Sequence, residues 1–365
     1  MSSNQDQTPK HVNNTLSMKR TKTSPSLSKK RKVLKNFKRS PYDPEVLQGL
    51  QQLFPLGFPP PPTLESLPMM RINFAAMSAT DDELRRGGQI DFEERKIPGP
   101  EGAPEISLLI CRPSGPSSNT SNSLLPCIYH SHSGGMVFGN NRFCIESLLD
   151  WIVEMKIIVV SVEYRLSPEH SYPAPSEDCY AGLLWTVTHA QELGIDVSQI
   201  CVAGLSAGGG LSAAMTLMAR DRGGPKLQGQ LLFSPMLDDR DETFSTLQYD
   251  GMGIWDRQSN RFGWEALLGD KRGTSDVSPY AAPSRAKDLS NLPPAFIDVS
   301  STEIFRDEAI DYAQRIWQTG GIAELHVWPG GLHAFTILKD KTALSKNVLE
   351  ASNNWYRRLL ASHKK

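Results

Sequence analysis

One serine lies between glycines at the spacing of a nucleophile on a tight turn. The stretch VAGLSAGGG covers residues 202–210 and places Ser206 between Gly204 and Gly208. Residues 200–205 are typical of a strand, and a helix-forming run, AGGGLSAAMTLMAR, follows at once. A serine at such a junction raises its hydroxyl above a sheet on a strained turn. The pattern therefore predicts a nucleophile, although a glycine loop without chemistry would have the same composition.

A serine hydroxyl is a weak nucleophile, so a base and an orienting acid are needed. On a sheet of this kind they follow the serine in the order acid, then histidine. Glu303 comes just after the predicted strand 295–300, and His333 lies in a glycine-bearing loop after the predicted strand 323–328. Asp307 is the alternative acid, although it begins a predicted helix, where acidic residues suit the dipole.

Donors for a developing oxyanion are expected from a second glycine loop. The predicted strand 126–131 runs into a loop in which Gly134 and Gly135 can present backbone N–H groups, and Ala207 would complete the set. His130 and His132 form the alternative, a metal-binding pair. No further ligand stands out, so we predict no metal and assign His132 to bracing the loop.

Alternating strands and helices indicate how these residues are positioned. Strands are predicted at 106–111, 126–131, 157–164, 200–205, 230–234, 295–300 and 323–328. Helices are predicted at 43–53, 69–84, 146–154, 178–192, 207–220, 307–319 and 344–362. This order predicts a mostly parallel sheet with helices on both faces.

The segment 237–270 is longer than a crossover between two strands requires. We interpret it as an insertion over the carboxyl ends of the strands, with an ordinary surface excursion as the alternative. A substrate pocket is predicted from aromatic and sulfur side chains of this insertion and of the glycine loop, namely Met136, Phe138, Trp255, Phe262 and Trp264.

The first forty residues differ from the rest in charge. They hold eleven lysines and arginines and one acidic residue, whereas the 365-residue chain has a net charge of −1. We predict a disordered basic tail over 1–40 and an acidic folded body that does not bind nucleic acid. The run Lys29–Lys32 is either a nuclear import signal or a solvated segment without a specific reader.

The remaining composition favours a cytoplasmic protein. No run of about 18 apolar residues predicts a membrane span, and the polar start MSSNQDQTPKHVNN does not have the pattern of a secretory signal. Five scattered cysteines are typical of buried thiols in a reducing compartment.

Five blocks in this order resemble the hormone-sensitive-lipase-like esterases, a branch of the α/β-hydrolase fold. They are HSGG at 132–135, YRLSPEHSYPAPSED at 164–178, GLSAGG at 204–209, STEIFRDE at 301–308 and GLHAF at 331–335. The resemblance covers about residues 41–362 and implies no cofactor. It also implies N-terminal cap helices at 41–85, a cap insertion at 239–272, and an α/β-hydrolase core at 86–238 and 273–365.

Three positions depart from the family pattern. Ser133 replaces the first glycine of HGGG, Leu205 stands where many members have aspartate, and Glu303 stands where aspartate is usual. Each departure leaves the proposed nucleophile in place. In the block at 164–178, Glu169 and His170 resemble parts of a structural loop rather than catalytic groups.

These observations predict a serine carboxylesterase that cleaves small esters of short to medium acyl chains through an acyl-enzyme, in a chain that forms a homodimer. The same residues would serve a lactone or amide hydrolase or an acyltransferase. A non-catalytic small-molecule-binding protein on the same fold is the alternative from another class.

Overall fold

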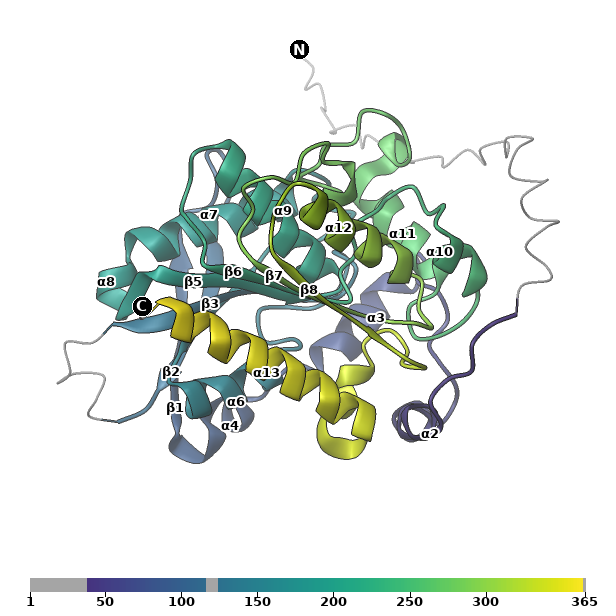
Figure 1. The fold of residues 1–365 in the computed structure, drawn as a ribbon, viewed down its shortest axis with the longest axis horizontal. Coiled ribbons are helices and arrows are strands. Elements are labelled where there is room, and N and C mark those ends of the chain that lie inside the picture. Colours follow the sequence, from purple (N-terminus) through teal and green to yellow (C-terminus); the bar gives the residue numbers. More distant parts are fainter. Residues whose placement is uncertain (1–37, 116–123, 364–365) are drawn as a thin grey trace, which may run out of the picture. The chain divides into compact units, whose positions relative to one another are not determined.

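The central sheet of this computed structural model has eight strands in the order β1-β2-β4-β3-β5-β6-β7-β8 (Figure 1). The structure describes residues 38–115 and 124–363. β2 runs antiparallel to β1 and β4, and the other neighbours pair in parallel. The strands are β1 (Ile90–Ile97), β2 (Ile106–Pro113), β3 (Leu125–Ser131), β4 (Ile158–Glu163), β5 (Ile195–Leu205), β6 (Gly229–Phe233), β7 (Ala295–Ser300) and β8 (Ala323–Trp328). The predicted mostly parallel α/β architecture is confirmed.

Helices cover both faces of the sheet, as the apolar strands require. Figure 1 shows α7 (Ala174–Thr188), α9 (Ala207–Asp221) and α12 (Arg306–Gln318) on one face, and α6 (Glu146–Met155) and α13 (Ala343–His363) on the other. Two buried clusters result, one beneath each helix layer. Helix α9 is the most enclosed, because every residue from Ala207 to Ala219 is buried.

The remaining helices lie at the carboxyl ends of the strands or in connections. They are α2 (Pro44–Leu53), α3 (Leu67–Ala75), α4 (Asp81–Arg85), α8 (Ala190–Leu193), α10 (Phe244–Gln248) and α11 (Arg257–Leu268). Single 3₁₀ turns are η1 (Arg86–Gly88), η2 (Gly269–Lys271), η3 (Pro283–Arg285) and the longer η4 (Phe335–Lys341). In the described residues, no helix is both long and apolar enough to span a bilayer.

Three predictions about elements are wrong, and one of them is the single helix predicted over 178–192, which is α7 followed by α8. Strand β1 was not expected, because IDFEERKI is a charged edge strand in which only Ile90 and Ile97 are fully buried. The single helix predicted over 69–84 is two helices. α3 ends at Ala75, and Thr80 is the N-cap of α4. The Thr80 hydroxyl accepts from the Glu83 N–H, and the Glu83 carboxylate accepts from the Thr80 N–H, which is a capping box.

Residues 39–365 form one compact unit of the chain. Residues 1–37 of the predicted disordered tail lie outside the described residues, and these include the basic run Lys29–Lys32. The first described contact of the unit is made by Arg39, whose side chain donates to the backbone oxygen of Gln248 at 2.6 Å.

Candidate active site

Ser206 is held on a sharp turn between β5 and α9. Its φ of 59° and ψ of −119° lie where non-glycine residues are rarely found. The backbone is fixed on both sides, since the Ser206 N–H donates to Phe233 O at 2.8 Å and its carbonyl accepts from Met236 N–H at 2.9 Å. A Cβ on Gly204 would come within 2.2 Å of Gly208, so the turn requires glycine there.

The structure brings Ser206, His333 and Glu303 together from three separate connections. His333 Nε2 lies 3.0 Å from Ser206 Oγ, which is hydrogen-bonding distance. His333 Nδ1 lies 3.4 Å from Glu303 Oε2, longer than a strong hydrogen bond. All three side chains are buried. With its proton on Nδ1, the imidazole would accept from the serine hydroxyl through Nε2.

Glu303 has polar neighbours that the sequence reasoning did not connect with the site. Ser234 Oγ donates to Glu303 Oε2 at 3.4 Å, and the Ser234 N–H donates to the buried carboxylate of Asp298 at 3.2 Å. Burial, with a contribution from the Glu303 charge, raises the pKa of Asp298 to about 7. The signal for Asp298 was present, because it is the one acidic residue of the apolar strand β7.

Asp307, the alternative acid, is directed elsewhere. It lies in the first turn of α12, and its carboxylate accepts from the Ser245 N–H at 2.6 Å, on the predicted insertion. The next residue, Glu308, is buried and accepts from the Leu237 N–H at 2.7 Å. Burial holds the pKa of Glu308 well above its usual range.

The glycine loop after β3 leaves backbone donors free near the serine. Gly134 and Gly135 have φ values of 114° and 62°. The Gly134 carbonyl accepts from the Val137 and Phe138 N–H groups at 3.0 and 2.9 Å. Within the described residues, the N–H groups of Gly134, Gly135 and Ala207 donate to no backbone acceptor.

His132 braces this loop. Its Nδ1 lies 2.8 Å from the Ser133 carbonyl, its ring stacks on Tyr164 at a centroid distance of 4.0 Å, and the Tyr164 hydroxyl donates to the His132 carbonyl. Burial lowers the pKa of His132 to about 4, so the ring is neutral at pH 7. The described part of the chain holds no group of three potential metal ligands.

A cavity of about 320 Å³ opens beside the serine and the glycine loop. Apolar side chains form most of its wall, including Pro59, Pro62, Met70, Phe74, Met77, Phe138, Ile254 and Trp255. A mostly apolar cavity with a few polar groups is typical of small-molecule binding sites. Both α3 and the segment before α11 contribute, so residues distant in sequence share one wall.

Of the five predicted pocket residues, two line this cavity. Phe138 and Trp255 do, and the Trp255 ring lies so close to Gly135 that a Cβ there would come within 2.3 Å. Met136, Phe262 and Trp264 do not line it, and their part in a substrate pocket stays a prediction. Met136 and Trp264 are buried in the hydrophobic core, and Phe262 packs against that core.

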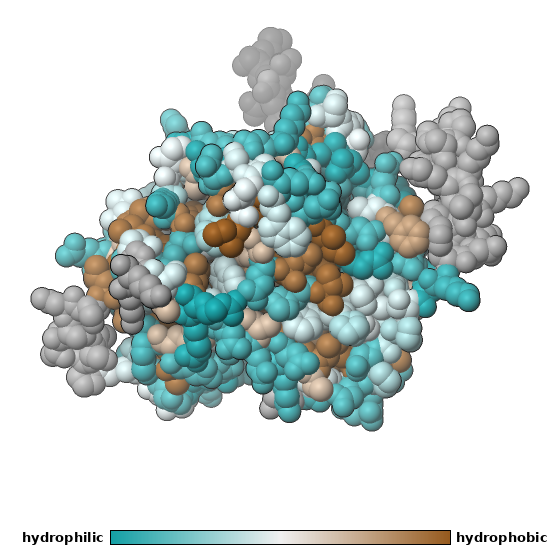
Figure 2. Space-filling view, viewed as in Figure 1, coloured by the Kyte–Doolittle hydropathy of each residue, from teal (hydrophilic) through white to brown (hydrophobic). Residues whose placement is uncertain are grey.

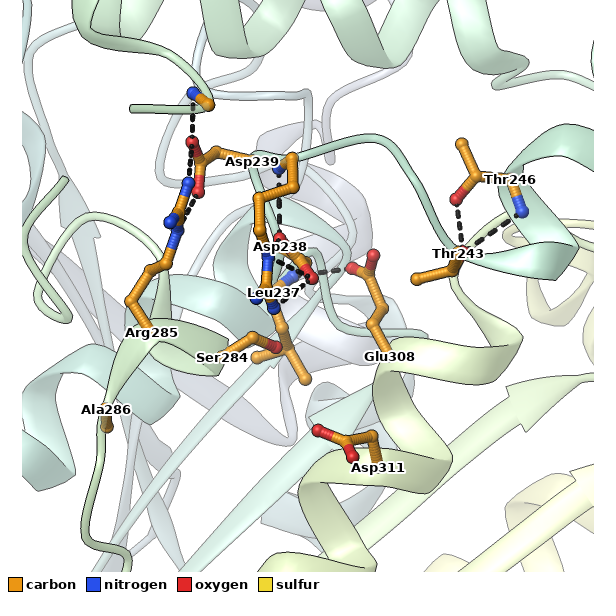
Figure 3. Close-up of polar contacts among 12 residues, drawn as sticks. Leu237, Asp238, Asp239, Thr243, Thr246, Ser284, Arg285, Ala286, Glu308 and Asp311 are labelled. Atoms are coloured by element: carbon orange, nitrogen blue, oxygen red, sulfur yellow. Dashed lines mark hydrogen bonds and ion pairs between the residues drawn. The ribbon is translucent and has the colours of Figure 1, made fainter. Parts of the chain in front are cut away.

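One carboxylate ties the two ends of the segment 239–272 to the core, as Figure 3 shows around Asp239. Asp239 is fully buried and binds Arg285 through both oxygens, at 2.7 and 2.9 Å. It also accepts from the Gly273 N–H at 2.6 Å. Asp239 therefore holds both ends of the segment, and Trp255 lies between these ends in the sequence.

Two of the three departures from the resemblance, Ser133 and Leu205, line the cavity. Ser133 Oγ donates to Cys144 Sγ at 3.2 Å, and Leu205 is half-buried at the cavity wall. In the block at 164–178, Glu169 forms an ion pair with Arg71 at 2.8 Å. Arg71 also donates to the Ser167 carbonyl, so Glu169 fastens α3 to a loop and lies outside the reacting centre.

Comparison with known proteins gives one family match and many relatives. Residues 128–337 match a family described as alpha/beta hydrolase fold. The carboxylesterase NlhH of Mycobacterium tuberculosis is 33% identical over 299 residues, which is 81% of this chain and 89% of that protein. An arylesterase of Saccharolobus solfataricus is 32% identical over 224 residues, 60% of this chain and 70% of its own.

Solved structures show the same likeness. A bacterial heroin esterase superimposes with a TM-score of 0.79 and 35% identity, covering 87% of this chain and 98% of its own. The esterase LipW from Mycobacterium marinum has a TM-score of 0.72 and 29% identity, with 82% and 91% covered.

Proposed function

Because this chain belongs to the α/β-hydrolase family, in its hormone-sensitive-lipase-like branch, and is a carboxylic ester hydrolase, we propose that Ser206, His333 and Glu303 are its catalytic residues. One observation carries the assignment. The hydroxyl of Ser206, on a strained turn that begins α9, lies 3.0 Å from His333 Nε2. A nucleophile and its base within hydrogen-bonding distance form the arrangement that serine hydrolases need.

The mechanism follows from these positions. His333 takes the hydroxyl proton as Ser206 attacks the ester carbonyl, and the Glu303 carboxylate stabilises the imidazolium that forms. The N–H groups of Gly134, Gly135 and Ala207 bind the oxyanion. His333 then protonates the leaving alkoxide, which leaves an acyl-enzyme. Water, deprotonated by His333, attacks the acyl carbonyl. The bond from this carbon to Ser206 Oγ then breaks, and His333 returns the proton to Oγ as the acid is released.

We assign the substrate to the cavity beside Ser206. Its apolar wall favours small uncharged esters over charged substrates. The segments 41–85 and 239–272 both contribute side chains to that wall, and in our proposal they form the cap that selects the substrate. Lactones, amides and acyl transfer would use the same catalytic residues, so the cap sets the preference.

The first experiment measures hydrolysis of p-nitrophenyl esters from acetate to laurate by the wild type and by Ser206→Ala. We expect the wild type to turn over esters of short and medium acyl chains, and the variant to lose at least about 10⁴-fold in kcat because no other nucleophile replaces the serine. The thermal unfolding midpoint of the variant should match the wild type. Full activity in a folded Ser206→Ala protein would refute the assignment.

A fluorophosphonate probe separates two further outcomes. If the wild type is inert on all these esters but Ser206 is labelled, the nucleophile is correct and the substrate is another acyl compound, for which lactones and anilides are the next test. If neither turnover nor labelling occurs in folded protein, Ser206 is not activated. The intact hydrogen bond to His333 predicts labelling.

Location and assembly are separate proposals. All five cysteines are free, which fits the reducing cytoplasm, and Lys29–Lys32 would direct part of the protein to the nucleus. Microscopy of the full chain beside one lacking residues 1–40 tests this.

A homodimer is supported by the large hydrophobic side chains exposed near the edge strand β8, namely Trp317, Ile322 and Val327. Sedimentation equilibrium of wild type and Ile322→Lys tests it. Figure 2 shows hydrophobic surface among hydrophilic residues on the viewed face.

A further inference from the structure

A second cavity, of about 80 Å³, lies behind the nucleophile turn. It is on the sheet face that carries α6 and α13 (Figure 1), and its wall comes from both helices, from η4 and from the end of β5. Trp151 of α6 and Leu349 of α13 are parts of this wall. Neither residue touches the larger cavity beside Ser206, so the two spaces have largely separate linings.

Three residues line both cavities, and they lie between them. Cys144, Leu205 and Ile337 belong to the wall of the larger space and to that of the smaller one. Each is only half-buried, because each faces open space on more than one side. Leu205 immediately precedes Ser206, and consecutive Cα atoms are about 3.8 Å apart. The division between the cavities is therefore within a few bonds of the proposed acyl attachment point.

The dividing wall is apolar. Leu205 and Ile337 are hydrocarbon side chains, and burial raises the pKa of the Cys144 thiol to about 12, so it is uncharged at pH 7. A carboxylate at the position of Leu205 would be poorly solvated beside an acyl chain. The leucine makes this contact favourable for methylene groups.

We propose that the second cavity is an acyl-chain subsite: an unbranched acyl chain on Ser206 runs past Leu205, between Cys144 and Ile337, and places its distal carbons against Leu349. This inference rests on the proposed function, since it takes Ser206 as the acylated residue. It assigns the acyl side of medium-chain esters to the sheet face of α6 and α13, and leaves the larger cavity for the alcohol portion.

The test compares kcat/KM across acyl chain lengths in a variant whose second cavity is partly filled by a larger side chain. Leu349→Trp enlarges a side chain that lines only the second cavity, and Glu350→Trp is the matched control, because Glu350 is exposed on the same helix and lines neither cavity. We expect Leu349→Trp to lower kcat/KM for p-nitrophenyl laurate relative to butyrate by at least about tenfold, because methylene contacts in a pocket discriminate on that order. Glu350→Trp should leave the ratio unchanged.

A second variant acts on the dividing wall. Leu205→Ala widens the passage, so the laurate-to-butyrate ratio of kcat/KM should rise relative to the wild type. The inference is overturned if Leu349→Trp changes all chain lengths equally, or if the wild type hydrolyses butyrate but not laurate. Butyrate turnover that depends on Ser206 would preserve the proposed function in both cases. Loss of Ser206-dependent turnover on every ester would overturn the proposed function instead.

Discussion

The Glu303 carboxylate has an incomplete set of partners for a buried charge. One oxygen is 3.4 Å from both His333 Nδ1 and Ser234 Oγ, and the other, Oε1, has no hydrogen-bond partner in the described residues. Such contacts are often long in the absence of substrate and tighten when positive charge develops on the imidazole. In our proposal the carboxylate therefore acts mainly in the transition state, when the imidazole becomes charged.

Substitutions that remove only the negative charge distinguish Glu303 from Asp307 as the candidate catalytic acid. We expect Glu303→Gln to lower kcat by about 10³–10⁴-fold with little change in KM, because the imidazolium loses its counter-charge. Asp307→Asn is the control, since an amide oxygen can still accept from the Ser245 N–H. Steady-state kinetics on p-nitrophenyl butyrate measures kcat and KM for both variants. A larger loss of kcat in Asp307→Asn than in Glu303→Gln would show that Asp307, rather than Glu303, is the catalytic acid.

A second carboxylate makes stability depend on pH. Glu163 ends β4 and accepts from the Asn141 N–H, and burial raises its pKa from 4.5 to about 7. Between these two pH values the native state holds a proton that the unfolded state has lost, so this group makes the protein less stable as pH rises. The contribution is complete below the unfolded pKa and is lost as pH passes about 7.

Glu163→Gln removes that loss and keeps an oxygen to accept from Asn141. The free energy of unfolding of the variant should exceed that of the wild type by about 1–3 kcal/mol at pH 8, given about 1.4 kcal/mol for each unit of pKa shift. At pH 4.5 the gap should close. Urea unfolding at the two pH values measures it, and an equal difference at both would show that folding does not raise the pKa of Glu163.

At the scale of elements, one buried carboxylate holds both ends of the segment 239–272. Asp239 binds Arg285 and the Gly273 N–H, so it joins the segment's two ends to η3 and to the core. The bond matters for the site because Ile254 and Trp255 lie between these ends and line the cavity. A change at Asp239 should therefore act on substrate binding from outside the pocket.

Asp239→Ala leaves Arg285 partly buried without its counter-charge, which destabilises a protein by about 3–5 kcal/mol. We expect a lower unfolding free energy and a KM for butyrate that rises more than kcat falls, because Ser206 and His333 are on other elements. Asp270→Asn, exposed in the same segment, is the control and should change neither. If Asp239→Ala lost kcat alone, the segment would be affecting the chemistry directly.

Several elements could be predicted from sequence because their signals are local. The glycines around Ser206 fix the turn, and the proposed acid and base each follow a later strand, so the sequence alone indicates all three residues. Long-range features left no such signal. β1 is an edge strand of mostly charged residues that its pairing with β2 stabilises. Ser234 approaches Glu303 across 69 residues of sequence, and no spacing rule predicts that contact.

At the scale of the whole molecule, the described residues of the site lie in one compact unit. Every residue of the proposed catalytic set and both cavities belongs to the unit that starts at Arg39. We expect a chain that lacks residues 1–38 to unfold at the same temperature and to keep its kcat/KM on butyrate. Calorimetry and kinetics on both forms check this. A drop in kcat/KM with an unchanged unfolding temperature would assign the first segment a part in catalysis.

The crowding around the nucleophile turn has a consequence for laboratory evolution. A Cβ on Gly204, Gly208 or Gly210 would come within 2.3 Å of backbone atoms, so a saturation library across 204–210 should yield almost no survivors at those codons. Leu205 differs, because its side chain faces open space on two sides. Selection for a new acyl preference should therefore converge on that single codon, where mutational freedom and proximity to the reacting ester coincide.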